Sequence, residues 1–375
     1  MISLARSNAP TLTLPFVDGM SSLSSRYFDN AATTPVDERV VREMLPFFGE
    51  AFGNAHSIHG FGQRARAAVE LARERIAALI GAEDAAQILF TSGATESNNQ
   101  ILRSFLDAAV GPFEHSAVRE PALRLGLSFL GNADLTVLPP LEHVELISLM
   151  AVNNEIGTIW SPAELGPHAD YIHSDITQAV GKVPIDLTGI DFASFSSHKF
   201  YGPKGVGALY FKDVSPEPLL IGGEQENSLR GGTLNVPAIV GMGAAAAIAE
   251  QEMDTDRAHA EELRSVLLTG LEGCTDWQVN GGDRVSPYIL SLSFAGVQGE
   301  SLVVEVDRSG FAMSSGAACS SGSTEPSHVL QALNLNPVFL RGTVRVSFGR
   351  YCTLESTRDL SNSLRHAVEN LRRMN

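Results

Sequence analysis

The lysines of this 375-residue chain are few, and one of them has neighbours suited to covalent chemistry. All four lysines lie between residues 182 and 212. Lys199 follows a short apolar run and lies in the sequence FSSHKFYG, beside hydroxyl groups and a histidine. A lysine amine in such surroundings can form a Schiff base next to a bound phosphate. From these residues alone, an ordinary solvated lysine is an equally good interpretation.

Two further segments place polar groups directly after apolar runs. The turn TSGATESN, residues 91–98, follows the run 88–90 and has the small, hydroxyl-rich character of an anion-binding helix N-terminus. Most such turns only cap a helix, so the turn by itself is weak evidence. Asp175 ends another apolar run, and ligands of open α/β sheets bind at the carboxyl ends of strands. Taken alone, Asp175 could equally be a helix N-cap.

The three cysteines are too few and too scattered for a disulfide framework or a zinc site. Cys319 lies in SSGAACSSGS, where its neighbours are all Gly, Ala or Ser. A segment with so little side chain to bury is expected to be a mobile loop that presents the thiol as a nucleophile. Cys274 and Cys352 lie at the edges of predicted elements, and we expect both to be structural.

Short apolar runs with little polar alternation recur through the first two thirds of the chain. This pattern is typical of strands buried on both faces of a parallel sheet that helices cover. The predicted strands cover residues 88–90, 146–152, 171–173, 192–195 and 206–211, and later 289–294 and 344–348. Helices are predicted at 236–253, 256–271 and 356–373, one earlier helix beginning at the N-cap Thr34 and another ending at Gly81.

This pattern predicts a large α/β domain over residues 27–253 and a small α+β domain over 254–375 that carries the Cys319 loop. Residues 1–26 are expected to be a flexible lead-in, and the first residues after it can pack on the small domain. The formal net charge of −16 and the pI near 5.0 argue against a nucleic-acid surface. The sequence has no apolar run of membrane-spanning length, and its cysteine content favours a reducing, cytoplasmic location.

Several motifs taken together resemble the NifS/IscS-type cysteine desulfurases, group I of the class-V aminotransferase family. These proteins are pyridoxal-phosphate enzymes of fold type I, the aspartate aminotransferase fold. The resemblance implies a large domain with a mostly parallel seven-stranded sheet and a small α+β domain. The motifs are YFDNAATTP (27–35), TSGATES (91–97), VNNEIG (152–157), DITQAVGKVPID (175–186), SFSSHKFYGPKGVGALY (194–210), RGGT (230–233), SSGAACSSGSTEPSHVL (314–330) and VRVSFGR (344–350).

The resemblance also implies a role for each candidate residue. Lys199 would hold pyridoxal phosphate as a Schiff base and later shuttle a proton, while Cys319 would take the substrate sulfur as a persulfide. The remaining roles concern cofactor and substrate binding: Asp175 at the pyridine nitrogen, Gln178 at the phenolic oxygen, His115 stacked on the ring as a catalytic group, Ala94, Thr95, Ser196 and His198 at the phosphate, Thr233 at the partner subunit's phosphate, and Asn154 and Arg345 at the substrate carboxylate, with Asn154 also near the cofactor.

The activity implied is conversion of L-cysteine to L-alanine, with the persulfide sulfur passed on for iron–sulfur cluster assembly, tRNA thiolation or a similar use. The partners implied are a second copy of the chain and a sulfur-acceptor protein such as an iron–sulfur scaffold, with no direct nucleic-acid contact and no membrane. No resident metal is implied, although Cys319 could share an iron–sulfur cluster with a scaffold. Selenocysteine lyase and a non-catalytic scaffold that retains the fold remain as alternatives.

Overall fold

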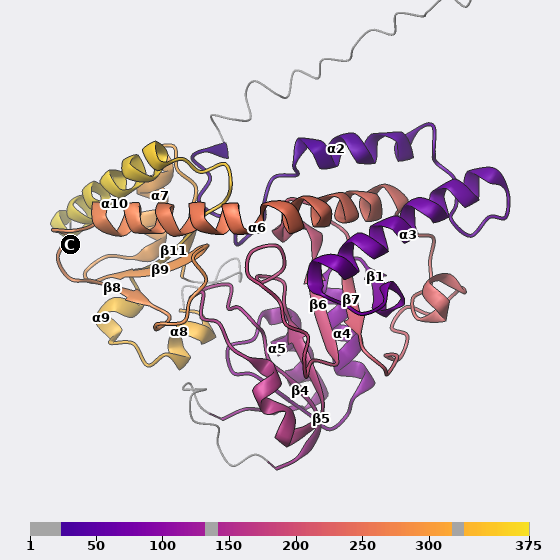
Figure 1. Ribbon diagram of the computed structural model, residues 1–375. Helices are drawn as coiled ribbons and strands as arrows, with labels where there is room; N and C mark the ends of the chain where they lie inside the picture. Colours follow the sequence, from indigo (N-terminus) through magenta and orange to yellow (C-terminus); the bar gives the residue numbers. More distant parts are fainter. Residues whose placement is uncertain (1–23, 132–141, 317–325, 375) are drawn as a thin grey trace, which may run out of the picture.

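The computed structural model describes residues 24–131, 142–316 and 326–374 (Figure 1). Two sheets lie side by side and share one continuous hydrophobic core. The elements of the larger part, in chain order, are α2 (Glu38–Met44), α3 (Gly60–Ile80), β1 (Ile88–Thr91), α4 (Ala94–Ser104), β2 (Ala108–Val110), α5 (Ser116–Leu125), β3 (Ser128–Phe129), β4 (Val144–Ser148), β5 (Ala169–Asp175), β6 (Phe192–Ser196), β7 (Gly207–Phe211) and α6 (Val236–Gly270).

The larger sheet has seven strands in the order β1-β7-β6-β5-β4-β2-β3. Strands β3, β2, β4, β5 and β6 run parallel, and β7 is antiparallel to both of its neighbours, β6 and β1. The predicted mostly parallel seven-stranded sheet is therefore confirmed. Since β7 reverses direction between them, β1 and β6 point the same way, and the carboxyl ends of β1, β5 and β6 meet at one edge.

Helices cover both faces of this sheet. Phe90 and Phe195 belong to the core that α3 and α6 close, whereas Leu89 and Phe192, on the opposite face, pack with α4 and α5. All residues of β1 and β6 are buried, as expected for strands sandwiched between two helix layers. Burial on both faces explains why these strands show apolar runs with little alternation.

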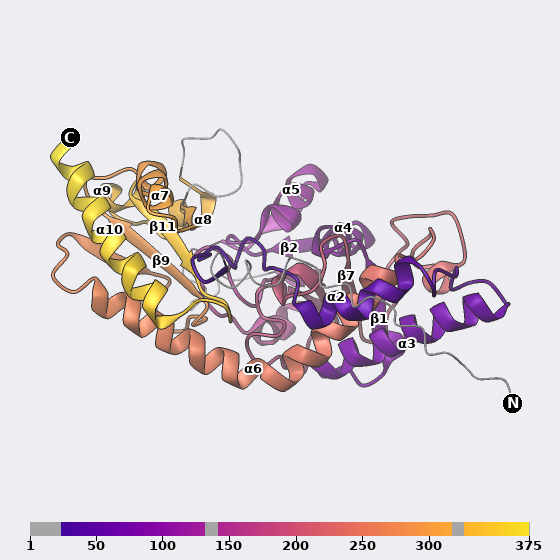
Figure 2. The ribbon, with the colours of Figure 1, turned by 90° about the horizontal axis from the view of Figure 1, so that it is seen from above.

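The smaller part contains a four-stranded antiparallel sheet in the order β10-β11-β9-β8. Helices α7 and α10 pack together beside it (Figure 2). Its elements are β8 (Trp277–Asn280), β9 (Ile289–Phe294), α7 (Gly299–Arg308), β10 (Ser314–Ser315), α8 (His328–Ala332), α9 (Pro337–Leu340), β11 (Thr343–Ser347) and α10 (Leu354–Met374).

A single long helix joins the two parts. The prediction of separate helices at 236–253 and 256–271 is wrong, because α6 runs without interruption from Val236 to Gly270. The residues between the two predicted helices, Asp254 and Thr255, are neither Gly nor Pro, so they do not end the helix. Figures 1 and 2 show α6 extending from α2 and α3 to α10, which it contacts. The expected domain boundary at 253/254 falls inside this helix and stays a prediction.

The N-terminal helix start also differs from expectation. Helix α2 is capped by Asp37, whose carboxylate accepts from the Arg39 N–H, and not by Thr34. The Thr34 hydroxyl donates to His198 O and accepts from Tyr201 N, so it is used in tertiary bonding. Helix α3 ends as predicted, with Gly81 in the left-handed conformation at φ 74°.

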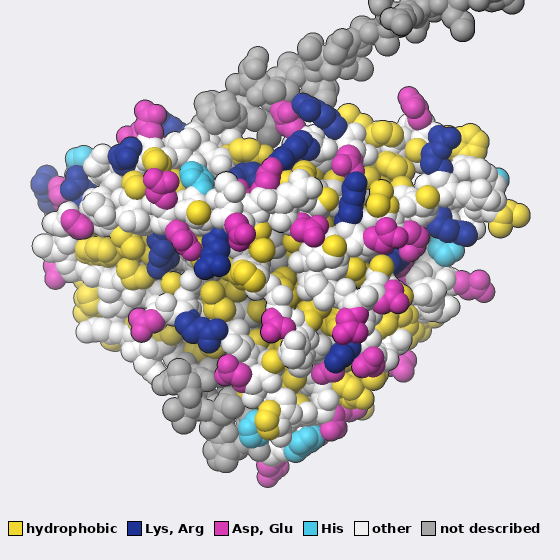
Figure 3. All heavy atoms as spheres, in the orientation of Figure 1, with side chains coloured by type: hydrophobic (Ala, Val, Ile, Leu, Met, Phe, Trp, Pro, Cys, Tyr) yellow, Lys and Arg dark blue, Asp and Glu magenta, His cyan; other side chains and the backbone are white. Residues whose placement is uncertain are grey.

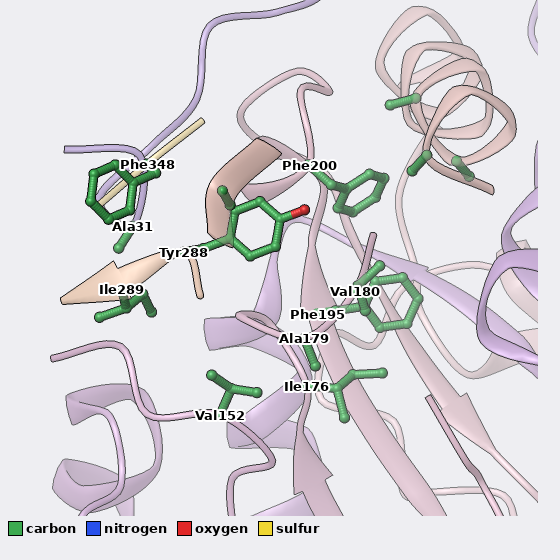
Figure 4. Close-up of a cluster of buried hydrophobic side chains, with 14 of the residues drawn as sticks. Ala31, Val152, Ile176, Ala179, Val180, Phe195, Phe200, Tyr288, Ile289 and Phe348 are labelled. Atoms are coloured by element: carbon green, nitrogen blue, oxygen red, sulfur yellow. The ribbon is translucent and has the colours of Figure 1, made fainter. Parts of the chain in front are cut away.

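The segment before α2 connects the two sheets. Tyr27 and Asp29 form β-bridges with Ala312 and Ser347 of the smaller part. Phe28 packs against Phe348 with an edge-to-face geometry at 6.2 Å between ring centroids. Figure 4 shows Phe348, Ala31 and other side chains from distant segments gathered in one buried cluster. This segment fastens the start of the described chain to the smaller part.

Candidate active site

Lys199 lies at the carboxyl edge of the larger sheet, on a short 3-10 turn directly after β6. Its Nζ donates to Ala31 O at 2.6 Å and to Ala32 O at 2.8 Å. These carbonyls come from the segment that bridges the two sheets, nearly 170 positions away in sequence. The amine is thus held over the strand ends by backbone groups and is not a freely solvated lysine.

Asp175 ends the neighbouring strand β5 and is 5% exposed. Its Oδ2 accepts from Asn98 Nδ2 at 2.8 Å, and its Oδ1 accepts from Thr177 N at 3.0 Å. These two donors hold the buried carboxylate at the strand end. Sequence reasoning missed Asn98, although its place in the 91–98 turn, four residues after Ala94, was an available signal.

Gln178 lies just beyond Asp175 and is also buried. Its Nε2 donates to Ala31 O at 2.9 Å, so that this carbonyl is shared with the Lys199 amine. Its Oε1 accepts from Lys182 Nζ at 3.0 Å. Lys182 is a second residue that sequence reasoning missed, despite its spacing of four from Gln178 within the 175–186 motif.

The N-terminus of α4 lies beside these groups. The N-cap residue of this helix is Gly93, which has no side chain to cap it and has φ 154°, a conformation that favours glycine. Ala94 N donates to Ser196 Oγ at 2.7 Å, which joins α4 to the end of β6. Gly207 pairs between Thr91 and Ser196, and a Cβ at Gly207 would come within 2.6 Å of Gly93 Cα. The close approach of the backbones brings the helix N-terminus, with its partial positive charge, to the Lys199 edge.

Two histidines complete this edge, and burial lowers the pKa of both. His115 is the N-cap of α5, where its Nδ1 accepts from Ala117 N at 3.1 Å. His198 Nδ1 lies 3.0 Å from Thr33 Oγ1, and burial, followed by the charge of Lys199, lowers its pKa to about 4. Both imidazoles are therefore neutral at physiological pH. Thr95, which is exposed, and His115 line a common pocket of about 300 Å³ between α4 and α5.

Arg345 reaches the same region from β11 of the smaller sheet. Its Nη1 donates to Asn154 O at 2.8 Å, and its Nη2 donates to Asp29 Oδ1 at 2.8 Å. The structure thus brings Asn154 and Arg345 together, although through the Asn154 backbone. The guanidinium is buried, and its Nε has no hydrogen-bond partner among the described residues. Asp29 is a third site residue that sequence reasoning missed.

Cys319 lies outside the described residues, so the structure describes only the two ends of its loop. On one side, Ser314 Oγ accepts from Arg345 Nη2 at 3.1 Å. On the other side, His328 Nε2 lies 2.9 Å from Glu114 O, next to His115. Ser327 donates to the buried Glu155 carboxylate. Both ends of the loop are therefore attached to the site.

Thr233 stands apart from the other candidates. It is exposed on the loop before α6 and, within the described part of the chain, has no hydrogen bond to the groups around Lys199.

Within the described ranges, no three His, Cys, Asp or Glu side chains come together as metal ligands would. The gathered groups are an amine, a buried carboxylate, a neutral imidazole and a helix N-terminus, which is a set suited to a phosphorylated aldehyde.

Comparisons with known proteins agree with this arrangement. The family described as "Aminotransferase class-V" matches residues 26–360. "Cysteine desulfurase IscS" of Dictyoglomus turgidum is 42% identical over 377 residues, covering 92% of this chain and 95% of the relative. The namesake from Rickettsia bellii is also 42% identical, with 87% of each chain covered.

Solved structures give the same result. A "NifS-like protein" is 34% identical with a TM-score of 0.83, and the match covers 92% of this chain and 99% of that chain. A structure titled "SspA in complex with cysteine" is 30% identical with a TM-score of 0.73, over 88% and 100% of the two chains. The matches extend over nearly the whole of both chains in sequence and in structure. The chain therefore belongs to the class-V aminotransferase family, within its group of cysteine desulfurases.

Proposed function

We propose that this protein is a pyridoxal-phosphate-dependent cysteine desulfurase that converts L-cysteine to L-alanine and takes the sulfur on Cys319. The observation that supports this most strongly is the placement of Lys199. Its amine lies at the sheet edge, fixed by Ala31 O and Ala32 O, with the buried Asp175 at the end of the adjacent strand. Family members use pyridoxal phosphate, and the residues present fit that group.

The fit rests on three features of the chain. Lys199 Nζ would be the point of attachment, and the buried Asp175 carboxylate would accept the pyridinium N–H. The N-terminus of α4, where Gly93 at the N-cap has no side chain and Ser196 Oγ lies next to Ala94 N, would hold the phosphate. Ser196 lies beside that helix end, and His198 directly precedes the lysine. His115 would pack on the ring. When bound, pyridoxal phosphate supplies an electron sink for negative charge at the substrate carbon.

The other chemical steps belong to side chains of this protein. Arg345 and Asn154 would bind the substrate carboxylate, for which the unpartnered Arg345 Nε offers a donor. The Cys319 thiolate would attack the substrate sulfur, forming an S–S bond while the C–S bond breaks. The electron pair of the broken bond remains on carbon, and the Lys199 amine would deliver the proton that completes alanine.

We further propose that the protein works as a homodimer. A surface formed by Leu45, Phe48, Phe52, Ile58 and Phe61 exposes half or more of each of these apolar side chains. Figures 1 and 2 place the α2–α3 connection that carries it at the end of the molecule far from α10. An exposed apolar cluster of this kind is typical of a subunit interface. In the dimer, Thr233 would reach the partner's cofactor phosphate.

The persulfide would then be passed to an acceptor protein. On the face shown in Figure 3, acidic and basic side chains are interspersed, without a continuous basic patch among the atoms described. In the described ranges, the structure contains no helix with the length and apolar character that crossing a membrane requires. Because the chemistry needs a reduced Cys319, we place the reaction in a reducing compartment such as the cytoplasm.

The test combines cofactor absorbance with product analysis. Protein purified with pyridoxal phosphate should show the visible absorbance of a lysine-bound cofactor and should release alanine from L-cysteine. Lys199→Ala should lose that absorbance and the activity, whereas Lys204→Ala, which alters an exposed lysine nearby, should keep both. Retention of the lysine-bound spectrum in Lys199→Ala would contradict the proposal. A rate with selenocysteine far above that with cysteine would favour the lyase alternative.

A further inference from the structure

The proposed reaction leaves one buried amine without a role. Lys182 is 4% exposed, although lysine is among the residues least often buried. Burial lowers its pKa to about 7, and the positive charges of Lys199 and Arg345 act in the same direction. An apolar side chain at this position would avoid the free-energy cost of burying an amine, so the presence of the amine indicates a role in the site.

The contacts of Lys182 connect it to the site. Its Nζ donates to Gln178 Oε1 at 3.0 Å, and the Tyr288 ring lies 5.9 Å away from Nζ. Lys182 and Gln178 are four residues apart on a tight turn, in which Val180 N and Val183 N bond to the carbonyls of Ile176 and Ala179. Figure 4 shows Tyr288 in the apolar cluster that closes this region. The groups that face Lys182 are thus an amide, an aromatic ring and two like charges.

This contact determines how the Gln178 amide is turned. With Oε1 occupied by Lys182, the NH₂ group faces Ala31 O at 2.9 Å, and Ala31 O also accepts from Lys199 Nζ at 2.6 Å. A rotated amide would put its NH₂ group against the Lys182 amine and an oxygen against the Ala31 carbonyl. The contact between the two oxygens would be unfavourable at any pH, and the contact between the two nitrogens would be unfavourable while Lys182 is protonated, so protonated Lys182 and the Ala31 carbonyl together select one orientation.

We propose that Lys182 is a positioning residue that fixes the Gln178 amide with its NH₂ group on the side of the Ala31 carbonyl, which the Lys199 amine also binds, so that Gln178 offers a hydrogen-bond donor to the cofactor's phenolic oxygen. This inference rests on the proposed use of pyridoxal phosphate. The donor draws negative charge from the phenolic oxygen, which otherwise stabilises the proton on the lysine–cofactor nitrogen. Loss of the donor therefore raises the pKa at which the visible absorbance changes.

The experiment is a spectroscopic pH titration of the cofactor-loaded protein without substrate. Lys182→Met, which has a similar length but no donor, should raise the pKa of the absorbance change by about 0.5–1 unit, the size of one net hydrogen bond. Lys182→Arg retains a donor and should stay close to the parent. Lys212→Met replaces an exposed lysine at the far end of β7 and serves as the matched control.

A double-mutant cycle separates positioning from a direct effect of the Lys182 charge. Gln178→Leu should produce a similar upward shift, and adding Lys182→Met to it should produce little more. Fully additive shifts, or an unchanged titration in Lys182→Met, would overturn the positioning role. If Lys182→Met does not fold, a Lys182→Arg shift as large as that of Gln178→Leu would overturn it instead. A parent protein without the visible absorbance would contradict the proposed function itself and not this inference.

Discussion

Arg345 shows how the site is prepared for a charged ligand. Arg345 is 8% exposed, and the donors of its guanidinium are only partly satisfied by Asp29, Ser314 and the Asn154 carbonyl. The buried Nε without a described partner is unfavourable unless something binds there. A substrate carboxylate would accept a hydrogen bond from Nε and would compete with Asp29 for the Nη2 donor.

Replacing Arg345 with Ala should raise the KM for L-cysteine roughly tenfold to a hundredfold, the cost of losing a charge-assisted hydrogen bond. Cofactor absorbance should change less than KM, because the hydrogen bonds of Arg345 within the described residues go to Asn154, Asp29 and Ser314. Arg345→Lys should recover only part of the loss, since a point charge does not copy the planar fork. Steady-state alanine release measures this, with the exposed Arg341→Ala as the control; an unchanged KM would mean that the carboxylate binds elsewhere.

At the level of residues, sequence reasoning selected the groups whose chemistry is unusual and missed those that support them. Lys199 stood out because lysines are scarce, and Asp175 because it ends an apolar run. Asn98 and Asp29 are common residue types, and their importance comes from contacts 77 and 316 positions away. Such tertiary partners cannot be derived from local spacing. Lys182 was an exception, because its four-residue spacing from Gln178 is local.

Among the elements, the segment before α2 does the most to assemble the site. Ala31 and Ala32 bind the Lys199 amine, Thr33 contacts His198, and Asp29 binds Arg345. One short segment therefore binds groups from both sheets and holds them close to one another. Local signals in it favoured a helix starting at Thr34, and tertiary hydrogen bonds overrode that preference. Apolar runs predicted β1, β4, β5, β6, β7, β9 and β11, because burial on both faces leaves a clear pattern in sequence. The short strands β2, β3, β8 and β10 were not predicted.

Glu155, which accepts a hydrogen bond from Ser327 after the Cys319 loop, should make the free energy of unfolding depend on pH. Burial raises the pKa of this carboxyl to about 7, from an ordinary value near 4.5, while Ser327 donates to it. Between these values the folded state binds more protons than the unfolded state, so the free energy of unfolding falls as pH rises from about 4.5 to 7. Glu155→Gln should remove this penalty. The free energy of unfolding of the variant, minus that of the parent, should therefore be about 1–3 kcal/mol larger at pH 8 than at pH 5.

Urea unfolding of parent and variant at the two pH values measures this difference. Glu164→Gln, which changes an exposed glutamate, should show the same pH dependence as the parent. A difference between Glu155→Gln and the parent that does not grow with pH would contradict the raised pKa.

For the whole molecule, the two parts are continuous and not loosely linked. Helix α6 spans both, and one hydrophobic core includes side chains from both sheets. Sequence patterns predicted the main strands of both sheets and the parallel character of the larger one, but not this continuity, since helix length between two domains depends on packing against α3 and α10.

The surface of Leu45, Phe48, Phe52, Ile58 and Phe61 should be covered by a second copy of the chain. Phe52→Glu places a charge on a side chain that is 69% exposed and lies 5.5 Å, centroid to centroid, from the Phe61 ring. The desolvation cost of this charge should shift the protein from dimer to monomer in sedimentation velocity. Leu106→Glu, at another strongly exposed apolar residue, should leave the mass unchanged. A parent that sediments as a monomer would contradict the dimer.

The central claim, that this chain takes sulfur from cysteine onto Cys319, is tested most directly by mass spectrometry of the protein after reaction with L-cysteine. The parent should gain the mass of one sulfur and release alanine, and Cys319→Ser should do neither while still binding the cofactor. Cys274→Ser and Cys352→Ser should react like the parent, because burial raises the pKa of both thiols, that of Cys352 to about 11, and leaves little reactive thiolate. Sulfur addition and alanine release by Cys319→Ser, or their loss only in one of the other two variants, would contradict the account.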